Sequence, residues 1–180
     1  MPTLTLTSDH DADTLLSENG FALLIGMLLD QQIAMELAFI GPHRLAQRID
    51  GPLDPATIAQ MPVDEVEEVF RQKPALHRYP GSMAKRVHAL AVALLEEYDG
   101  EASRVWTEAK DGKQLKRRLR ALPGFGQQKA QIFIALLGKQ CAVTPPGWEE
   151  VAGDYSLDGY RSIADVTSEE TLALVRQFKQ

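Results

Sequence analysis

The residues best suited to hold a ligand form a short turn between two chemically different segments. The turn, Leu122-Pro123-Gly124-Phe125-Gly126-Gln127-Gln128-Lys129, follows a basic segment and precedes a nearly all-apolar one. Two glycines around one apolar residue allow positive φ and a close approach of the backbone to another molecule. If helices flank the turn, the unpaired N–H groups and the dipole of the second helix favour a phosphate. The alternative is an ordinary turn between helices, and the surrounding residues must decide.

Charge is unevenly distributed along the chain. The formal net charge is −6, but residues 101–140 hold nine basic and only three acidic residues, which leaves −12 on the remainder. The nine are Arg104, Lys110, Lys113, Lys116, Arg117, Arg118, Arg120, Lys129 and Lys139. A run of bases can be a solvated helix face, yet this one leads directly into the glycine turn. We therefore interpret it as the electrostatic footprint of a nucleic-acid-binding surface.

Helical elements are expected to position this turn. Apolar residues recur at helical spacing and no window alternates with period two, so the predicted fold class is all-α in a single 180-residue domain. Ser82 and Thr144 are expected to cap helices, Thr144 with Pro145 at the first helical position. The expected helices cover residues 21–30, 31–45, 55–60, 63–70, 82–99, 113–121, 132–137 and 162–180.

Composition excludes several classes of protein. A single cysteine, Cys141, rules out a disulfide framework, a Cys-based zinc site and a four-cysteine iron–sulfur cluster. The histidines His43, His77 and His88 are scattered, so no metal site is expected. The first 13 residues lack a basic leader, and polar residues interrupt the apolar stretch 21–40. We expect a monomer in the cytoplasm, associated with the nucleoid, that binds no membrane.

Four segments together resemble a known family. Residues 121–126 resemble the hairpin of the helix-hairpin-helix (HhH-GPD) superfamily of DNA glycosylases, which includes endonuclease III and the alkylpurine glycosylases. Residues 23–33, 56–70 and 79–87 resemble other core segments of that family, in the same order, so the resemblance extends from residue 20 to about 143. It implies a two-lobed helical fold with the hairpin at about residues 113–137 and a closing helix at about 162–180.

The resemblance implies binding to double-stranded DNA and rotation of a nucleotide out of the duplex. Gln32 matches the wedge position, where an amide fills the gap in the base stack. The hairpin N–H groups would hold phosphates without reading sequence, and Lys129 would add salt-sensitive affinity. The implied DNA-binding residues are Gln32, Gly124, Phe125, Gly126, Gln127, Gln128 and Lys129.

The catalytic groups of the family are where this chain departs from it. The essential aspartate is expected near Thr144 and is missing, and the Schiff-base lysine of bifunctional members aligns with Gln128. Glutamine cannot form an imine, so lyase activity is not expected. Asp154 and Glu149 are candidates for a relocated carboxylate, and Trp148 or Tyr155 could stack on a base. The C-terminal segment replaces a cysteine-rich loop, so neither a cluster nor another cofactor is expected.

Two functional hypotheses follow, and whether the protein is an enzyme stays open. One is a monofunctional glycosylase that removes a damaged, for example alkylated, base. The other is a catalytically silent module that binds DNA lesions or distorted duplexes through the hairpin. A third reading, an all-α protein-interaction domain, leaves the basic hairpin unexplained.

Overall fold

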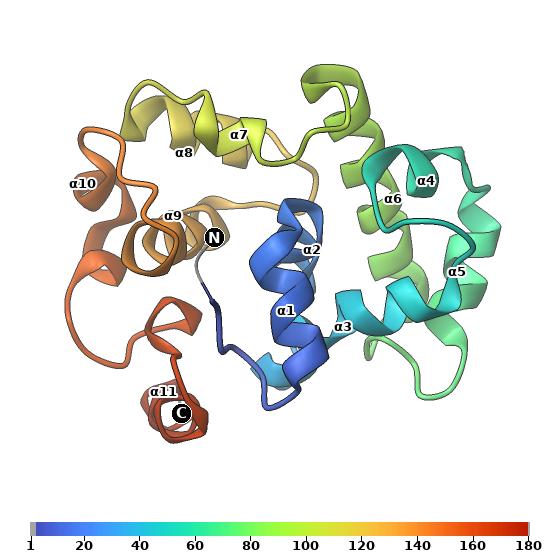
Figure 1. Cartoon of the computed structure of the whole chain (residues 1–180), viewed down its shortest axis with the longest axis horizontal. Coiled ribbons are helices and arrows are strands. Elements are labelled where there is room, and N and C mark those ends of the chain that lie inside the picture. Colours follow the sequence, from blue (N-terminus) through green and yellow to red (C-terminus); the bar gives the residue numbers. More distant parts are fainter. Residues whose placement is uncertain (1–2, 180) are drawn as a thin grey trace.

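The protein is entirely helical in the part that its computed structural model describes, residues 3–179 (Figure 1). No residue in that range lies in a strand, which confirms the all-α prediction. The elements are α1 (His10–Glu18), α2 (Gly20–Leu29), α3 (Met35–Arg48), α4 (Pro55–Gln60), α5 (Val63–Arg71), α6 (Pro80–Tyr98), α7 (Arg104–Thr107), α8 (Gly112–Arg120), α9 (Gln127–Gln140), α10 (Trp148–Ala152), the 3-10 turns η1 (Gly153–Ser156) and η2 (Ile163–Asp165), and α11 (Glu169–Phe178).

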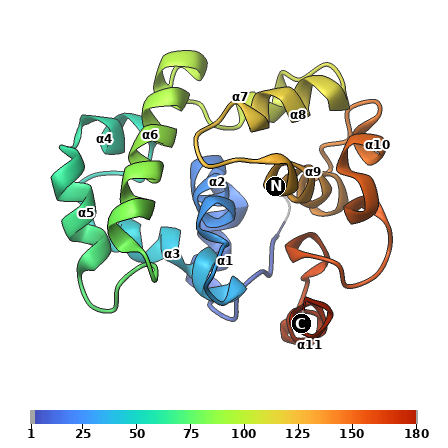
Figure 2. The same cartoon turned by 180° about the vertical axis from the view of Figure 1, so that it is seen from behind.

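Helix α2 is the central element of the fold. Every residue from Phe21 to Leu29 is buried, which explains why this helix is apolar all round rather than along one face. Helices α3 to α6 lie on one side of it and α7 to α11 on the other (Figures 1 and 2). The Asn19 side chain caps α2 by accepting a hydrogen bond from the N–H of Ala22. A central buried helix can therefore receive contacts from both halves of the chain.

Several local predictions are confirmed. Asp54 caps α4 with Pro55 at the first helical position, as the sequence indicated. Helix α5 buries Val66 and Phe70. The inward positions predicted for the basic helix, Leu115, Leu119 and Leu122, are all buried. These elements follow from caps and spacing within a few residues, which is the range over which sequence patterns are informative.

The predicted helix over residues 31–45 is wrong at its start. Helix α2 ends at Leu29 and α3 begins only at Met35, so residues 30–34 form a turn, here called the α2–α3 turn. Gln32 in this turn has φ +59°, a left-handed conformation that no helix contains. The last carbonyls of α2 accept hydrogen bonds from side chains far along the chain. The spacing of apolar residues does not reveal such distant bonds, so it could not predict where α2 ends.

Other helix boundaries also differ from expectation. Ser82 is not a cap, because α6 starts at Pro80, where proline fixes φ for the first helical position. Thr144 caps nothing: α10 begins at Trp148 after Gly147, which has φ +82°. The last expected helix is divided into η2 and α11, capped by Ser162 and Ser168, and Gln180 lies outside the described residues.

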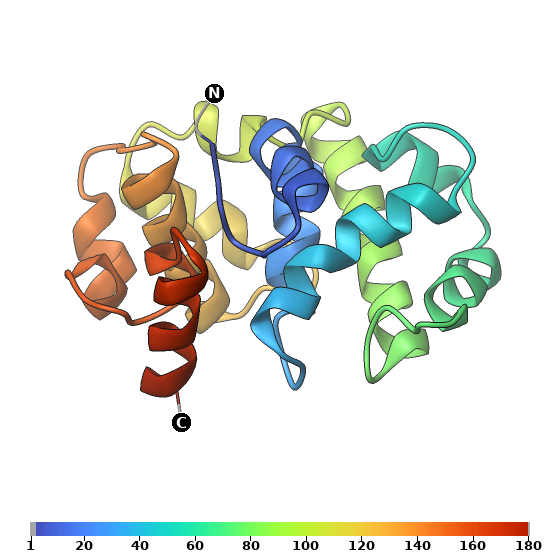
Figure 3. The same cartoon turned by 60° about the horizontal axis from the view of Figure 1, so that its bottom comes forward.

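The α2–α3 turn, the loop between α5 and α6 and the C-terminal end of α11 all point to the same side of the molecule (Figure 3). Seen from behind, the turn between α8 and α9 crosses over α2 (Figure 2). No single helix within residues 3–179 is long and apolar enough to cross a bilayer; α1 and α2 meet the test only as a pair, bent by 115°.

Candidate nucleic-acid interface

Helices α8 and α9 and the six residues between them, here called the hairpin turn (residues 121–126), form the predicted hairpin. Gly124 has φ +84°, and a Cβ at this position would lie 3.0 Å from Cδ1 of Leu28 in α2. Glycine is needed there both for the backbone conformation and for the close approach. Gly126 has an extended backbone with φ −87° and faces open space, so only one of the two glycines uses positive φ.

The start of α9 presents unpaired backbone donors. Gly126 is the N-cap and supplies no side-chain hydrogen bond, and the first intrahelical bond runs from the N–H of Ala130 to the carbonyl of Gly126 (3.1 Å). The N–H groups of Gln127, Gln128 and Lys129 therefore have no intrahelical acceptor. Gln127 and Gln128 are exposed. A 14-residue helix with open N–H groups at an exposed end is suited to an anion.

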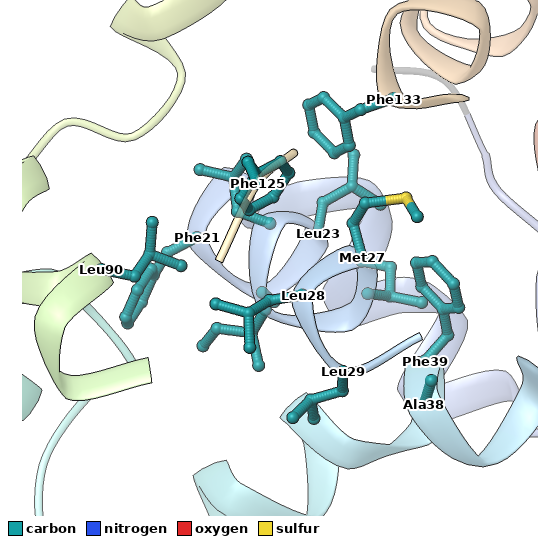
Figure 4. Close-up of a cluster of buried hydrophobic side chains, with 14 of the residues drawn as sticks. Phe21, Leu23, Met27, Leu28, Leu29, Ala38, Phe39, Leu90, Phe125 and Phe133 are labelled. Carbon is teal, nitrogen blue, oxygen red and sulfur yellow. The ribbon is translucent and has the colours of Figure 1, made fainter. Parts of the chain in front are cut away.

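Phe125 fixes the hairpin turn to the core. Its side chain is buried and packs edge-to-face against Phe133 of α9, with ring centroids 6.2 Å apart. Figure 4 shows both rings among the buried side chains that surround α2. Of the residues predicted to bind DNA, Phe125 has no side-chain surface to offer, and it serves instead to hold the glycines in place.

Lys129 has partners that the sequence did not indicate. Its Nζ donates to the carbonyl of Leu28 and to Oε1 of Gln31 (2.7 Å). The side chain is half-buried, and burial lowers the pKa of Lys129 to about 8, although the nearby carboxyl of Asp30 opposes that shift. The ammonium group is thus directed at the end of α2, while the backbone N–H of the same residue belongs to the open end of α9.

Gln32 lies in the α2–α3 turn, with its side chain exposed. A left-handed conformation costs a residue other than glycine about 1–3 kcal/mol and persists only where the surroundings enforce it. Nε2 of His77 donates to the carbonyls of Leu29 (3.1 Å) and Gln31 (3.0 Å). Nδ1 of His77 accepts from the N–H of Tyr79, and burial lowers the pKa of this imidazole, so the ring is neutral. The turn is therefore held by side chains on both sides.

The structure brings Gln32 and the hairpin together. Leu28, at the end of α2, touches the hairpin at Gly124 and gives its carbonyl to Lys129. Gln31, directly before Gln32, accepts from the same ammonium group. Segments about 100 positions apart in the sequence are thus in direct contact.

Some of the nine basic side chains in residues 101–140 are paired within the protein, and others are not. Arg104 pairs with Asp99 and Glu108, and Lys139 pairs with Asp165. Arg118 donates to main-chain carbonyls of α7, and Lys129 is engaged as described. Five basic side chains of this segment have no hydrogen-bonded or ion-pair partner among residues 3–179. They are Lys110, Lys113, Lys116, Arg117 and Arg120. The last four line a shallow groove between α8 and Val151 of α10.

The predicted replacement carboxylates lie away from the core. Glu149 in α10 and Asp154 in η1 are both exposed, and so is Thr144. The hydroxyl of Tyr155 accepts from the Gln128 side chain (3.0 Å), which places this ring beside the hairpin. Trp148 packs directly against Gly138 of α9, so it fills the space between the two helices. Cys141 is half-buried, and burial raises the pKa of its thiol to about 11, which makes it a poor nucleophile.

Two groups near Gln32 were missed by sequence reasoning. Asp30 ends α2, and burial raises the pKa of its carboxyl while Lys179 and Lys129 oppose the shift. His77 was considered only as a metal ligand. The one signal available in the sequence was an acidic residue directly before Gln31 and Gln32 at the end of an apolar helix.

Histidines are also less isolated than the sequence suggested. Ligand atoms of Asp9, Asp11 and His43 lie within 4.8 Å of one another at the start of α1. Asp9 already caps α1 by accepting from the N–H of Ala12 (2.9 Å), and both aspartates are exposed. These acids thus serve first to start the helix.

Comparisons of the chain with protein-family models, with curated proteins and with solved structures give no match. The fold and the site define an all-α protein with a glycine hairpin, an adjacent basic helix and an exposed glutamine held next to them.

Proposed function

We propose that this protein binds duplex DNA in the manner of base-excision repair proteins, and that its fold is that of the helix-hairpin-helix DNA glycosylase superfamily. The observation that carries the proposal is the contact between the two segments. Leu28 touches Gly124, and Lys129 donates both to the Leu28 carbonyl and to Gln31, the residue before Gln32. Two sequence segments that the resemblance assigned to one DNA-binding surface are neighbours in space. An ordinary turn between helices would not require that.

The hairpin is proposed to hold the phosphate backbone. The N–H groups of Gln127, Gln128 and Lys129 are open, and the α9 dipole adds partial positive charge. The groove of α8 supplies four more cations, and its lining reaches the hairpin turn at Ala121. Contacts of this kind carry no sequence information and weaken steeply as salt is added.

Gln32 is proposed to enter the base stack. Its amide can both donate and accept hydrogen bonds, so it can satisfy a base that has lost its partner. The α2–α3 turn is already fixed by Lys129 and His77, so less conformational entropy is lost on insertion.

Binding without base removal is the function that this geometry supports best. Glu149 and Asp154 are both exposed to solvent, and in the part of the chain that the structure describes neither is part of an enclosed pocket with the hairpin. Gln128 cannot form an imine, and the Lys129 ammonium is engaged with α2. Base excision is a second candidate because of Asp30, two residues before Gln32, whose carboxyl is partly buried and whose pKa is raised by that burial.

A proline substitution tests the hairpin directly. Gln127→Pro removes one open N–H at the first helical position, where proline is well tolerated, whereas Gln127→Ala retains it. We expect the proline variant alone to lose about tenfold in affinity, because a charge-assisted hydrogen bond contributes roughly 1.5–3 kcal/mol. Fluorescence anisotropy should follow intact, abasic and alkylated duplexes over a salt series.

The same samples should be scored for released base. Release that Asp30→Asn abolishes would establish excision, and binding without release would establish the silent module. Binding that does not respond to salt, or equal affinity of the two Gln127 variants, would contradict the proposed interface.

A further inference from the structure

We propose that Lys129 and His77 are positioning residues that hold Gln32 ready for insertion, and that Lys129 couples this turn to the phosphate site. The inference rests on the proposed function. It differs from the role expected for Lys129 from the sequence, which was a direct contact to phosphate.

The ammonium group of Lys129 joins α9 to the end of α2. It donates to the carbonyl of Leu28, 101 positions away, and to the Gln31 side chain. The backbone N–H of Lys129 is one of the open donors at the start of α9. A phosphate bound there would fix the same residue whose side chain fixes the α2–α3 turn.

His77 holds the opposite side of the turn. Its Nε2–H is shared by the carbonyls of Leu29 and Gln31, and its Nδ1 accepts from Tyr79. Helices commonly end in a left-handed glycine that satisfies the last carbonyls locally. Here Gln32 takes the left-handed conformation instead, and two distant side chains satisfy the carbonyls. An unfavourable local conformation maintained by remote contacts is typical of functional sites.

A buried ammonium is a costly way to stabilise the end of α2. The titratable groups around Lys129 are Asp30 from the end of α2, Arg86 from α6 and the neutral imidazole of His77, with Lys179 close to Asp30. Burial and Arg86 lower the pKa of Lys129 to about 8, so keeping this ammonium charged at neutral pH opposes folding. A methionine of similar length would fill the space without that cost.

The first test does not involve DNA. In Lys129→Met, we expect amide hydrogen exchange within residues 30–34 to become at least about tenfold faster, since this segment opens locally, while the melting temperature stays unchanged or rises. Exchange in α5 and α8 is the internal control. Unchanged exchange in residues 30–34 would overturn the positioning role, as would faster exchange throughout the protein with a large loss of stability.

The second test measures the preference for a duplex with one abasic site over an intact duplex. We expect Lys129→Met to reduce this preference about as much as Gln32→Ala does, and the double variant to lose little more, because the residues act through one contact network. Lys116→Met, in the α8 groove, should lower both affinities equally and keep the preference. Additive losses for Lys129→Met and Gln32→Ala would contradict the inference.

A pH series separates a positioning role of Lys129 from a purely structural one, because only the positioning role makes the abasic preference depend on the charge of Lys129. The abasic preference of the unmodified protein should fall between about pH 7 and about pH 9.5, as Lys129 loses its proton. Lys129→Arg stays charged and should show no such fall. The unmodified protein could bind no DNA while exchange in residues 30–34 still responds to Lys129→Met. That result would contradict the proposed function and the role of Lys129 in it, and would support only that Lys129 holds the α2–α3 turn.

Discussion

The hairpin turn and the α2–α3 turn differ in how their backbones are specified. The hairpin turn takes its left-handed residue from a glycine, Gly124, and is anchored by its own Phe125. The α2–α3 turn places a glutamine in the left-handed region and depends on Lys129 and His77 from other parts of the chain. The backbone of the hairpin turn is therefore specified mainly by its own residues, and the backbone of the α2–α3 turn by side chains from distant parts of the chain. In the proposed function, anchoring a phosphate needs only backbone groups, whereas insertion into the base stack needs a particular side chain at a strained position.

The largest effect is expected from the α8 groove, whose lining reaches the hairpin turn at Ala121 but includes no residue of the α2–α3 turn. Replacing Lys113, Lys116, Arg117 and Arg120 with glutamine should reduce DNA affinity by at least about 100-fold at low salt, because each neutralised phosphate contributes about 0.9 to the slope of log K against log salt. A salt titration of the variant should show a slope smaller by about 3.6 if each of the four cations neutralises one phosphate. Replacing Arg104 and Lys139, which pair internally, is the matched control. An unchanged slope would remove the groove from the interface.

Exchanging the residue types of the two turns tests their difference directly. Gly124→Ala should destabilise the protein by about 1–3 kcal/mol, since its Cβ meets Leu28 and its φ is positive. Gln32→Gly should instead stabilise it by about 0.5–1 kcal/mol, because glycine relieves the left-handed strain. Urea unfolding measures both. Gln32→Gly should nevertheless lose the abasic preference, and stability that falls in both variants would refute the comparison.

Acid should loosen the α2–α3 turn before the hairpin turn. Burial lowers the pKa of His77 below its usual value of about 6.5, so the unfolded chain binds this proton more readily. The stability that depends on neutral His77 is present above that value and is lost as the pH falls through the folded-state pKa. Melting temperatures measured across this window should fall less steeply in His77→Gln than in the unmodified protein. Parallel curves would show that this imidazole does not control the turn.

The smallest effect is expected at the carboxylates that the sequence singled out. Glu149→Gln and Asp154→Asn alter exposed side chains and should change stability by less than about 0.5 kcal/mol. DNA affinity should also be unchanged, as measured by anisotropy. Loss of base release in either variant, with release present in the unmodified protein, would place catalysis at α10 or η1 rather than near Asp30.

Prediction from sequence succeeded where the cause was local. Asp54 with Pro55 specified the start of α4, and the leucines of α8 specified its buried face. It failed at Ser82 and Thr144, where a residue with capping chemistry lay two or three positions from the proline (Pro80) or glycine (Gly147) at which the helix boundary actually falls. It failed again at residues 31–34, because an apolar pattern continues through a turn that only distant partners impose.

The sequence by itself determined the all-α class, the glycine turn before α9 and the basic character of α8. These properties depend on φ preferences, periodicity and charge within about one helix. Only the tertiary structure decided that Lys129 faces α2, that four of the nine bases line one groove and that Gln32 stands beside the hairpin. Each of these depends on packing around the buried helix α2, which joins residues as far as 101 positions apart.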